Sequence, residues 1–212
     1  KYGNFGTLEW IDQSISSAPK YRAVMYVLNS SATVPGNFTG IAASSNTITW
    51  TCTAPVDVFE YLIYSSTATG LNDYITRISS TNLSWVQTGL NPNTTSNMQI
   101  RMYSIFADTS PISAVATVST RANPPVNTSV VSVTSVVISI QWSANNNPIG
   151  TIFNVQCSTV NDFSLINQTA TTTVATYNLI NLSAATTYYV RIRAFNTDGN
   201  STSWDSIVST CT

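Results

Sequence analysis

The feature that most constrains the fold is a strict alternation of apolar and polar residues between positions 188 and 194. One set is Tyr188, Val190, Ile192 and Ala194, and the other is Tyr189, Arg191 and Arg193. A period of two is typical of a β-strand with one buried face, because successive side chains of a strand point to opposite sides. The alternation therefore predicts a half-buried strand that follows a turn near residue 184.

The same pattern occurs 92 residues earlier in the chain. The pairs at this spacing are Leu90 and Leu182, Met98 and Val190, Ile100 and Ile192, Met102 and Ala194, Trp50 and Trp142, Tyr61 and Phe153, and Ile63 and Val155. One offset shared by several expected strands indicates an internal repeat, and about 90 residues is the size of one small β-sandwich. The chain is therefore predicted to contain two copies of one β domain.

Leu182, Thr186 and Tyr188 carry a resemblance to a known family. In the arrangement called a tyrosine corner, the tyrosine ring packs inward while its hydroxyl bonds back to the preceding turn. With these residues the chain resembles the fibronectin type III family, which usually has proline at the position of Ala184. In the upstream copy Ser96 holds the tyrosine position, so that corner is expected to be bonded differently.

The resemblance implies an all-β chain with two tandem fibronectin type III-like, Ig-like β-sandwiches, preceded by an N-terminal two-strand segment. We expect the N-terminal segment at residues 1–34, domain one at 35–121 and domain two at 122–212. The linker contains Pro124 and Pro125, which lack amide donors and stiffen the chain. In domain two, residues 163–166 are predicted to form the fourth strand and residues 198–200 a tight turn before the last strand.

Composition argues against several classes of function. Charged residues make up only 8% of the chain, there is no histidine, and the formal net charge is −1. Nucleic acid is not an expected partner, because neutralising phosphates needs clustered Lys and Arg. The usual general base near neutral pH is missing without histidine. A surface made polar by Ser, Thr and Asn is typical of secreted proteins, so we expect an extracellular or cell-surface location.

No cofactor, metal or catalytic residue is expected from the motifs either. The sequence has no Gly-rich phosphate loop, no Gly-x-Ser-x-Gly and no paired cysteines at metal-binding spacing. Its scattered acidic residues are better explained as solvated turn residues than as a glycosidase pair. No run of 18 apolar residues occurs, so no membrane span is expected. The first residue, Lys1, is compatible with a processed secreted chain or with a fragment.

The three cysteines are Cys52, Cys157 and Cys211. An odd number in a secreted chain indicates one bridge plus a free thiol, or an intermolecular bridge. The fibronectin type III topology places Cys157 and Cys211 at the same pole of domain two, so the resemblance implies a disulfide between them. Cys52 shares the inward side of its strand with Trp50, and is either a buried free thiol or an intermolecular link.

Eight Asn-x-Ser/Thr sequons are candidates for N-linked glycans: Asn29, Asn37, Asn82, Asn93, Asn127, Asn167, Asn181 and Asn200. Composition alone would give about six in a chain so rich in Ser and Thr, so the number is weak evidence. Placement is better evidence, because most of them fall at predicted loops or strand ends, where a glycan is tolerated. We expect some to be glycosylated if the chain passes through a glycosylating pathway.

The N-terminal segment ends in an unusually apolar predicted strand. Its residues, a candidate assembly strand, are Arg22, Val24, Met25, Tyr26, Val27 and Leu28. Two strands cannot form a stable sandwich alone. The segment is therefore the tail of an upstream domain, or packs on domain one as extra strands, or pairs with the sheet edge of a neighbouring subunit.

Two functions follow as hypotheses. The first is a non-catalytic extracellular structural protein that self-assembles through its N-terminal strands into a surface filament or stalk. The second is a ligand-binding or spacer module of a cell-surface receptor or secreted multidomain enzyme, with other surface proteins or glycans as partners. Because fibronectin type III folds serve many functions, the fold does not choose between them.

Overall fold

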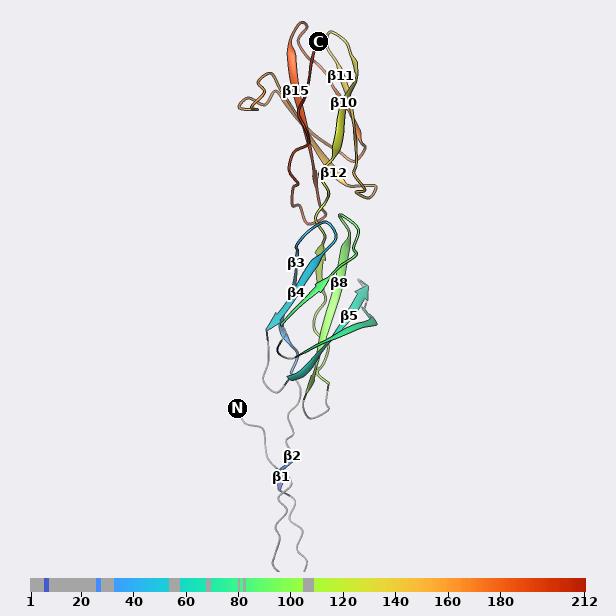
Figure 1. Ribbon diagram of the computed structural model, residues 1–212, viewed down its shortest axis with the longest axis vertical. Helices are drawn as coiled ribbons and strands as arrows, with labels where there is room; N and C mark the ends of the chain where they lie inside the picture. The colour runs from blue at the N-terminus through green and yellow to red at the C-terminus, as the bar shows by residue number, and fades with distance from the viewer. Residues whose placement is uncertain are drawn as a thin grey trace, which may run out of the picture.

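The computed structural model shows two β-sandwiches stacked end to end along the long axis of the molecule (Figure 1). It describes residues 6–7, 26–27, 33–53, 58–67, 70–79, 81, 83–104 and 109–212. No helix occurs within these described residues. The all-β expectation is therefore confirmed.

In the described residues of domain one, seven strands form two antiparallel sheets. They are β3 (Gly36–Ala42), β4 (Ile48–Thr53), β5 (Val58–Thr67), β6 (Gly70–Ser79), β7 (Ser84–Gln87), β8 (Thr95–Ser104) and β9 (Ala116–Ser119). One sheet has the order β3-β4-β7 and the other β6-β5-β8-β9.

Domain two repeats this plan strand for strand. Its strands are β10 (Val126–Val133), β11 (Ile138–Ser143), β12 (Ile152–Ser158), β13 (Gln168–Thr172), β14 (Thr176–Leu179), β15 (Thr187–Phe195) and β16 (Val208–Cys211). The sheets have the orders β10-β11-β14 and β13-β12-β15-β16. The repeat seen in the sequence is thus one sandwich topology used twice.

The alternation of the sequence appears directly as alternating burial. In β15, every second residue from Tyr188 to Ala194 is buried, and the residues between them are half-buried. The 92-residue pairs occupy equivalent core positions: Trp50 and Trp142 are both buried, as are Ile100 and Ile192. Each core lies between its own two sheets.

Gly40 allows the aromatic core of domain one to close. It pairs with Trp50 across β3 and β4, and a Cβ atom at this position would lie 2.7 Å from the Trp50 ring. With no side chain at residue 40, the Trp50 ring fits beneath β3, where it stacks on Phe38 at 5.5 Å between centroids. Trp142 of domain two instead makes an edge contact with Phe153, also at 5.5 Å.

The predicted tyrosine corner is present in domain two. The Tyr188 ring is buried, and its hydroxyl accepts a hydrogen bond of 3.0 Å from the amide of Ser183. Leu182 is buried in the same core cluster. In domain one the equivalent residue, Ser96, is also buried but brings no ring into the core.

The predicted strand at residues 163–166 is wrong. These residues form a turn in which Phe163 has a φ of 59° and the Ser164 amide donates to the Asp162 carboxylate at 2.8 Å. The strand is β13, which starts at Gln168 and pairs with β12. The apolar run misled the prediction because only Phe163 is buried, whereas Leu165 is 54% exposed.

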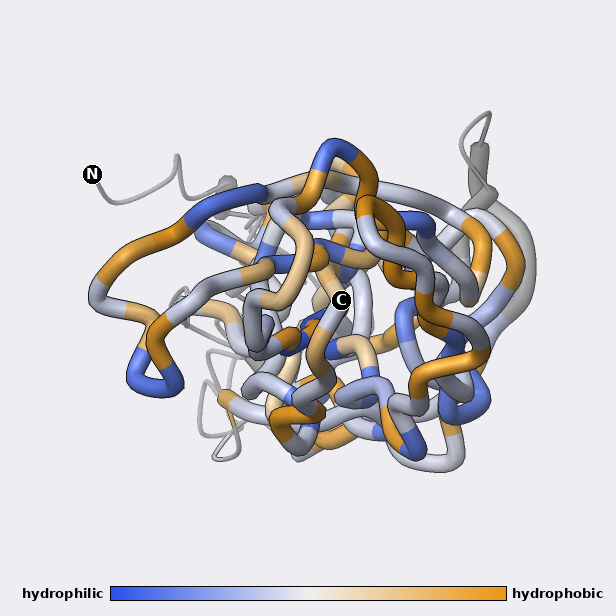
Figure 2. The backbone as a smooth tube through the Cα atoms, turned by 90° about the horizontal axis from the view of Figure 1, so that it is seen from above, coloured by the Kyte–Doolittle hydropathy of each residue, from blue (hydrophilic) through white to orange (hydrophobic). Residues whose placement is uncertain are grey.

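Polar and apolar residues are mixed on the outside of both sandwiches. Seen along the long axis (Figure 2), apolar and polar stretches alternate around the outline of the chain. Ile41 is 66% exposed and Val174 is 60% exposed. The low charge of the chain thus coincides with a surface on which single apolar side chains are common, which is ordinary for a folded protein.

Removing the tyrosine hydroxyl tests the corner. Tyr188→Phe should lower the free energy of unfolding of domain two by about 1 kcal/mol, because it removes one net hydrogen bond. Urea denaturation would measure this change. Tyr189→Phe, on the opposite face of the same strand, is the matched control, and an equal loss in both variants would contradict a specific role for the corner.

Candidate functional site

The best-defined polar arrangement in the molecule is the junction between the sandwiches, by which we mean residues 93, 119–125, 144–151 and 196–200. It brings the end of β9 and the linker of domain one against the loop between β15 and β16 of domain two. Ser119 and Thr120 are completely buried there, and Asn196 is 4% exposed. Burial at this level requires that the polar groups find partners across the junction.

Asp198 binds the end of β9. Its carboxylate accepts hydrogen bonds from the Ser119 amide at 2.8 Å and from the Ser119 hydroxyl at 3.1 Å. Hydrogen bonds to a charged acceptor are roughly twice as strong as neutral ones. The tight turn that the sequence predicted at residues 198–200 therefore also holds the neighbouring domain.

Two asparagines complete the contact from opposite sides. Asn196 Nδ2 donates to the carbonyls of Ser119 and Thr120 at 3.3 and 3.2 Å. Asn93 Nδ2 donates to Thr151 Oγ1 at 2.9 Å, while its Oδ1 accepts from the amide and hydroxyl of Thr197 at 2.7 and 3.0 Å. Both ends of the Asn93 amide are thus bound by domain two.

The linker is held by side chains as well. The Asn123 amide donates to Asn147 Oδ1, and Asn147 Nδ2 returns a bond to the Asn123 carbonyl, both at 2.8 Å. On the domain-one side, Arg121 donates from its backbone amide to Ser44 and from Nε to the Ala42 carbonyl, both at 3.1 Å. Two open clefts of about 300 and 460 Å³ flank the junction, and Arg121 and Asn200 line both.

A stack of aromatic rings and arginines holds the segment that follows the loop at residues 196–200. The Arg191 guanidinium lies 4.0 Å from the Phe163 ring centroid and 4.2 Å from that of Trp204. The Arg193 guanidinium lies 4.4 Å from the Trp204 ring centroid and 5.0 Å from that of Phe195. Cation–π contacts of this kind contribute about 0.5–2 kcal/mol each. They anchor Trp204 to the outer face of the sheet and thereby fix the start of β16.

Burial and a neighbouring positive charge change the pKa of one arginine in this stack. Desolvation, followed by the neighbouring Arg193 charge, lowers the pKa of Arg191 below its ordinary value. Gln156 Oε1 offsets this by accepting from Arg191 Nε at 2.9 Å and from Nη2 at 2.7 Å. Arginine stays protonated at neutral pH, so the stack carries two positive charges.

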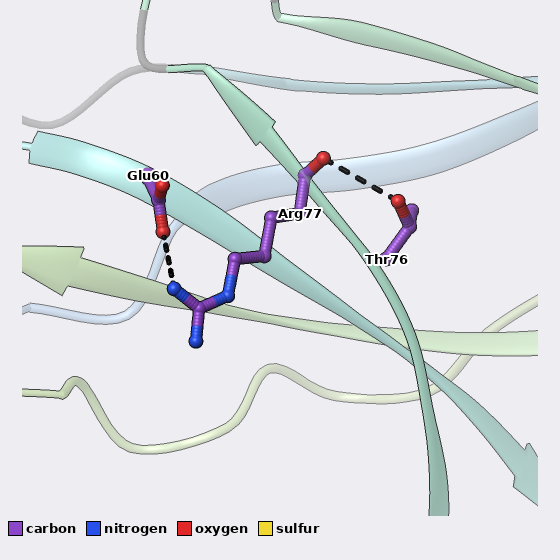
Figure 3. Close-up of polar contacts among 3 residues, drawn as sticks. All are labelled: Glu60, Thr76 and Arg77. Carbon is purple, nitrogen blue, oxygen red and sulfur yellow. Dashed lines mark hydrogen bonds and ion pairs between the residues drawn. The ribbon is translucent and has the colours of Figure 1, made fainter.

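An exposed ion pair joins β5 and β6 of domain one. Arg77 of β6 donates from Nη1 to Glu60 Oε2 of β5 at 3.1 Å, and Thr76 Oγ1 donates to the Arg77 carbonyl (Figure 3). The Arg77 side chain is 60% exposed, and surface pairs of this kind contribute little to stability because water screens them. Among the described residues no group of three or more His, Cys, Asp and Glu could hold a metal ion.

Comparison with known proteins gives the family of domain two. The family model described as "Fibronectin type III domain" matches residues 123–210. Residues 123–210 belong to the fibronectin type III family. The resemblance carried by Leu182, Thr186 and Tyr188 is thereby confirmed.

A solved structure shows the same fold for the tandem. A two fibronectin type III domain segment from chicken tenascin aligns with a TM-score of 0.56 and 15% identity, over 84% of this chain and 98% of that one. The FN1-FN3 domains of chicken CNTN1 align with a TM-score of 0.41 and 18% identity, over 92% and 71% of the two chains. The search of curated proteins gives no match.

Fibronectin type III domains are typical of extracellular and cell-surface structural and adhesion proteins, and are generally non-catalytic modules. Within the described residues no helix is long and apolar enough to cross a membrane. The domain boundaries at residues 35, 121 and 122 remain predictions, although the strands of each sandwich fall within them.

The disulfide expected between Cys157 and Cys211 is wrong, because the structure leaves both thiols free. Cys157 lies on β12 opposite Val190, and Val190 lies opposite Val208 of β16, three residues before Cys211. Two ladder spacings of about 4.8 Å already exceed the usual Cα separation of a disulfide, about 4.4–6.8 Å. The side chains also diverge: Cys157 is buried and Cys211 is exposed.

Cys52 is also free and is buried in the core of domain one. Its inward direction agrees with the prediction from Trp50, and burial raises the pKa of its thiol. A thiol in this position is not presented to a neighbouring molecule, so the structure favours the free-thiol interpretation over the intermolecular link.

The eight sequons fall into three groups by exposure. Asn37, Asn127, Asn167, Asn181 and Asn200 are exposed, Asn93 is half-buried in the junction, and Asn29 and Asn82 lie outside the described residues. Asn37, Asn93, Asn127 and Asn181 have positive φ values of 49°, 46°, 57° and 58°. Asparagine tolerates this left-handed region better than most residues. Backbone geometry is therefore a second reason for asparagine at these positions.

The candidate assembly strand is described only in part. Tyr26 and Val27 form β2 (Tyr26–Val27), which pairs with β1 (Gly6–Thr7) in an antiparallel two-stranded sheet. The described residues of this sheet pair with neither sandwich. Arg22, Val24, Met25 and Leu28 lie outside the described residues.

The sequence did not identify the residues that join the domains. The turn at Asp198 was visible, but its partner Ser119 is 79 positions away, and no local pattern links the two. The position of Trp204 could not be predicted from the sequence either, although its neighbours Arg191 and Arg193 are the only cationic residues of domain two.

Thiol accessibility gives a test of the cysteine assignment. In the native protein a thiol reagent should modify Cys211 quickly, and Cys52 and Cys157 only on unfolding. Burial raises the pKa of Cys157 from 9.0 to about 11. The folded form therefore keeps the thiol proton to higher pH than the unfolded form, and the stability of the fold decreases as the pH rises from about 9 to about 11. Mass spectrometry of the labelled peptides is the measurement, and rapid native labelling of Cys157 would contradict the structure.

Removing the Asp198 carboxylate should open the junction. Asp198→Ala leaves the buried Ser119 amide without its acceptor, which costs about 1–3 kcal/mol. Small-angle X-ray scattering should then show a broader distribution of interdomain distances, with the stability of each domain unchanged. Asp162→Ala, which removes a carboxylate of the same domain away from the junction, is the control and should leave the scattering as in the parent chain.

Proposed function

We propose that this chain is a non-catalytic extracellular structural protein, a subunit of a surface filament or stalk built from stiff pairs of fibronectin type III sandwiches. The observation that carries the proposal is the bonded junction. Its hydrogen bonds run from Asn93 and Ser119 of domain one to Thr151, Asn196, Thr197 and Asp198 of domain two.

The junction supports stiffness on energetic grounds. Each hydrogen bond of this kind contributes about 0.5–1.5 kcal/mol net. Because the linker tethers the two domains, closing the junction is an intramolecular event at an effective concentration in the millimolar range. Several bonds formed together then favour one relative orientation of the domains, which a structural spacer needs and a loose tether lacks.

Self-assembly is proposed from the N-terminal segment. β1 and β2 pair with each other, and their described residues pair with neither sandwich. A two-stranded sheet is marginally stable in water, and its open edges can pair with another chain. We propose that strand 22–28 completes its pairing with a neighbouring subunit and so builds a homopolymer.

The extracellular location is supported by composition and by family. A charged fraction of 8% without histidine suits a secreted protein whose surface is polar through Ser, Thr and Asn. The exposed sequons at Asn37, Asn127, Asn167, Asn181 and Asn200 would accept N-linked glycans there. Other surface proteins or glycans are further partners of this proposal, and nucleic acid is not.

One observation favours a second function, a ligand-binding or spacer module of a receptor or secreted multidomain enzyme. The stack of Arg191 and Arg193 with Trp204 lies on the outer face of the four-stranded sheet of domain two. Arginine and tryptophan are the residue types most often found at binding hot spots. This function needs no contact between copies of the chain.

Light scattering with and without residues 1–34 separates the two functions. Large assemblies that fall to monomers of about 20 kDa on truncation are expected, since strand pairing by the N-terminal segment drives the contact. Far-UV circular dichroism of the truncated chain checks that the sandwiches remain folded. A monomer in both forms would overturn the self-assembly proposal and leave the spacer or receptor module.

A further inference from the structure

Asn93 is at once an N-glycosylation sequon and a central residue of the junction. It begins the tripeptide Asn93-Thr94-Thr95. Its Oδ1 accepts from the amide and the hydroxyl of Thr197 at 2.7 and 3.0 Å, and its Nδ2 donates to Thr151 Oγ1 at 2.9 Å. The other sequons in the described residues are exposed. Asn93 is the half-buried one among them, and its side-chain amide is bonded to the neighbouring domain.

The geometry of the amide determines where that sugar would lie. N-glycosylation replaces one of the two Nδ2 hydrogens, which makes the side chain a secondary amide. Secondary amides prefer the trans form by about 2.5 kcal/mol, and this form places the sugar on the side of Oδ1. Oδ1 is bonded to Thr197 and Nδ2 to Thr151, which is 2% exposed. A sugar on Nδ2 therefore lies next to domain two.

We propose that glycosylation of Asn93 and closure of the junction exclude each other, so that a sugar on this residue converts the stiff two-domain rod into a hinged one. A chain without the sugar closes the junction through the Asn93 amide. A chain with the sugar loses the bonds to Thr151 and Thr197, and the sugar separates the facing surfaces. The two sandwiches then remain connected through the linker at residues 121–125.

The order of synthesis makes the sugar the controlling event. Asn93 is in the first sandwich, and its junction partners are 58 and 104 positions further along the chain. Domains generally fold as units from the N-terminus during synthesis. A transferase acting on the growing chain meets Asn93 before Thr151 and Thr197 can cover it. The inference rests on the proposed extracellular role only in that a secreted chain meets a glycosylating pathway.

The test uses the full chain secreted from a eukaryotic host behind a signal peptide. Glycopeptide mass spectrometry gives the fraction of chains with a sugar on Asn93, and hydrogen exchange of the Ser119 amide reports closure. That amide bonds Asp198 across the junction at 2.8 Å and does not touch Asn93 itself. We expect Ser119 to exchange at least tenfold faster in the glycosylated fraction than in the sugar-free fraction.

Two variants are matched controls. Thr95→Val removes the sequon and keeps the Asn93 amide and the other sequons, but it also removes the Thr95 Oγ1–Ser119 Oγ hydrogen bond of 2.9 Å, so its own sugar-free form is its reference. Asn93→Gln removes the sequon while keeping an amide. The parent chain and both variants, made without sugar in a bacterial cytoplasm, give the baseline for closure. Thr95→Val from the eukaryotic host should show Ser119 uniformly protected, as in its sugar-free form.

Each remaining outcome overturns the inference. A sugar on Asn93 with Ser119 still protected would show that the junction accommodates it. No sugar on Asn93, whatever the state of the other sequons, would make this residue a permanent structural contact and not a switch. Neither result bears on self-assembly, which the truncation of residues 1–34 tests separately.

Discussion

The carboxylate of Asp198 bound to the end of β9 is the interaction on which the arrangement of the two domains depends. It satisfies the amide and hydroxyl of Ser119, a residue with no exposed surface. Without an acceptor those donors would carry a desolvation cost that opposes closure. With it, the adjacent asparagines can bond, and the proline-containing linker has a defined course. A chain with only 8% charged residues thus uses one of its few carboxylates to join its two domains.

The second sandwich supports this contact from a distance. The loop that carries Asn196 and Asp198 leaves β15, whose outward residues Arg191 and Arg193 stack with Trp204 beyond the loop. The stack fixes both ends of the loop on a rigid sheet, as functional groups require when their position matters. Tertiary packing in domain two therefore determines how precisely domain one is held.

Much of the fold could be predicted from the sequence because its signals are local. Alternation at 188–194 and the 92-residue offset gave the strands and the two copies, and the tyrosine corner followed from Leu182 and Tyr188.

The failures have physical reasons. Residues 163–166 include three apolar side chains yet form a turn, since Phe163 adopts a positive φ and packs on Arg191. The disulfide failed because sharing a pole does not bring Cys157 and Cys211 onto one face of the sheet. The contact of Ser119 with Asp198 had no local signal, and the N-terminal strands are described too sparsely to choose their partner.

The outer pole of domain two repeats the backbone of the junction but not its side chains. Ala185 and Asn93 both have a positive φ, 53° and 46°. The backbone amide of Ala185 donates to the Thr212 carbonyl, and the backbone amide of Asn93 donates in the same way to the Arg121 carbonyl. Yet alanine has no amide group to offer, and Cys211 stands at the position of Ser119. A copy of the loop at residues 196–200 would find a backbone amide there, but neither the hydroxyl of Ser119 nor the side-chain amide of Asn93. The two poles therefore share a backbone conformation but differ in the side-chain groups that they present.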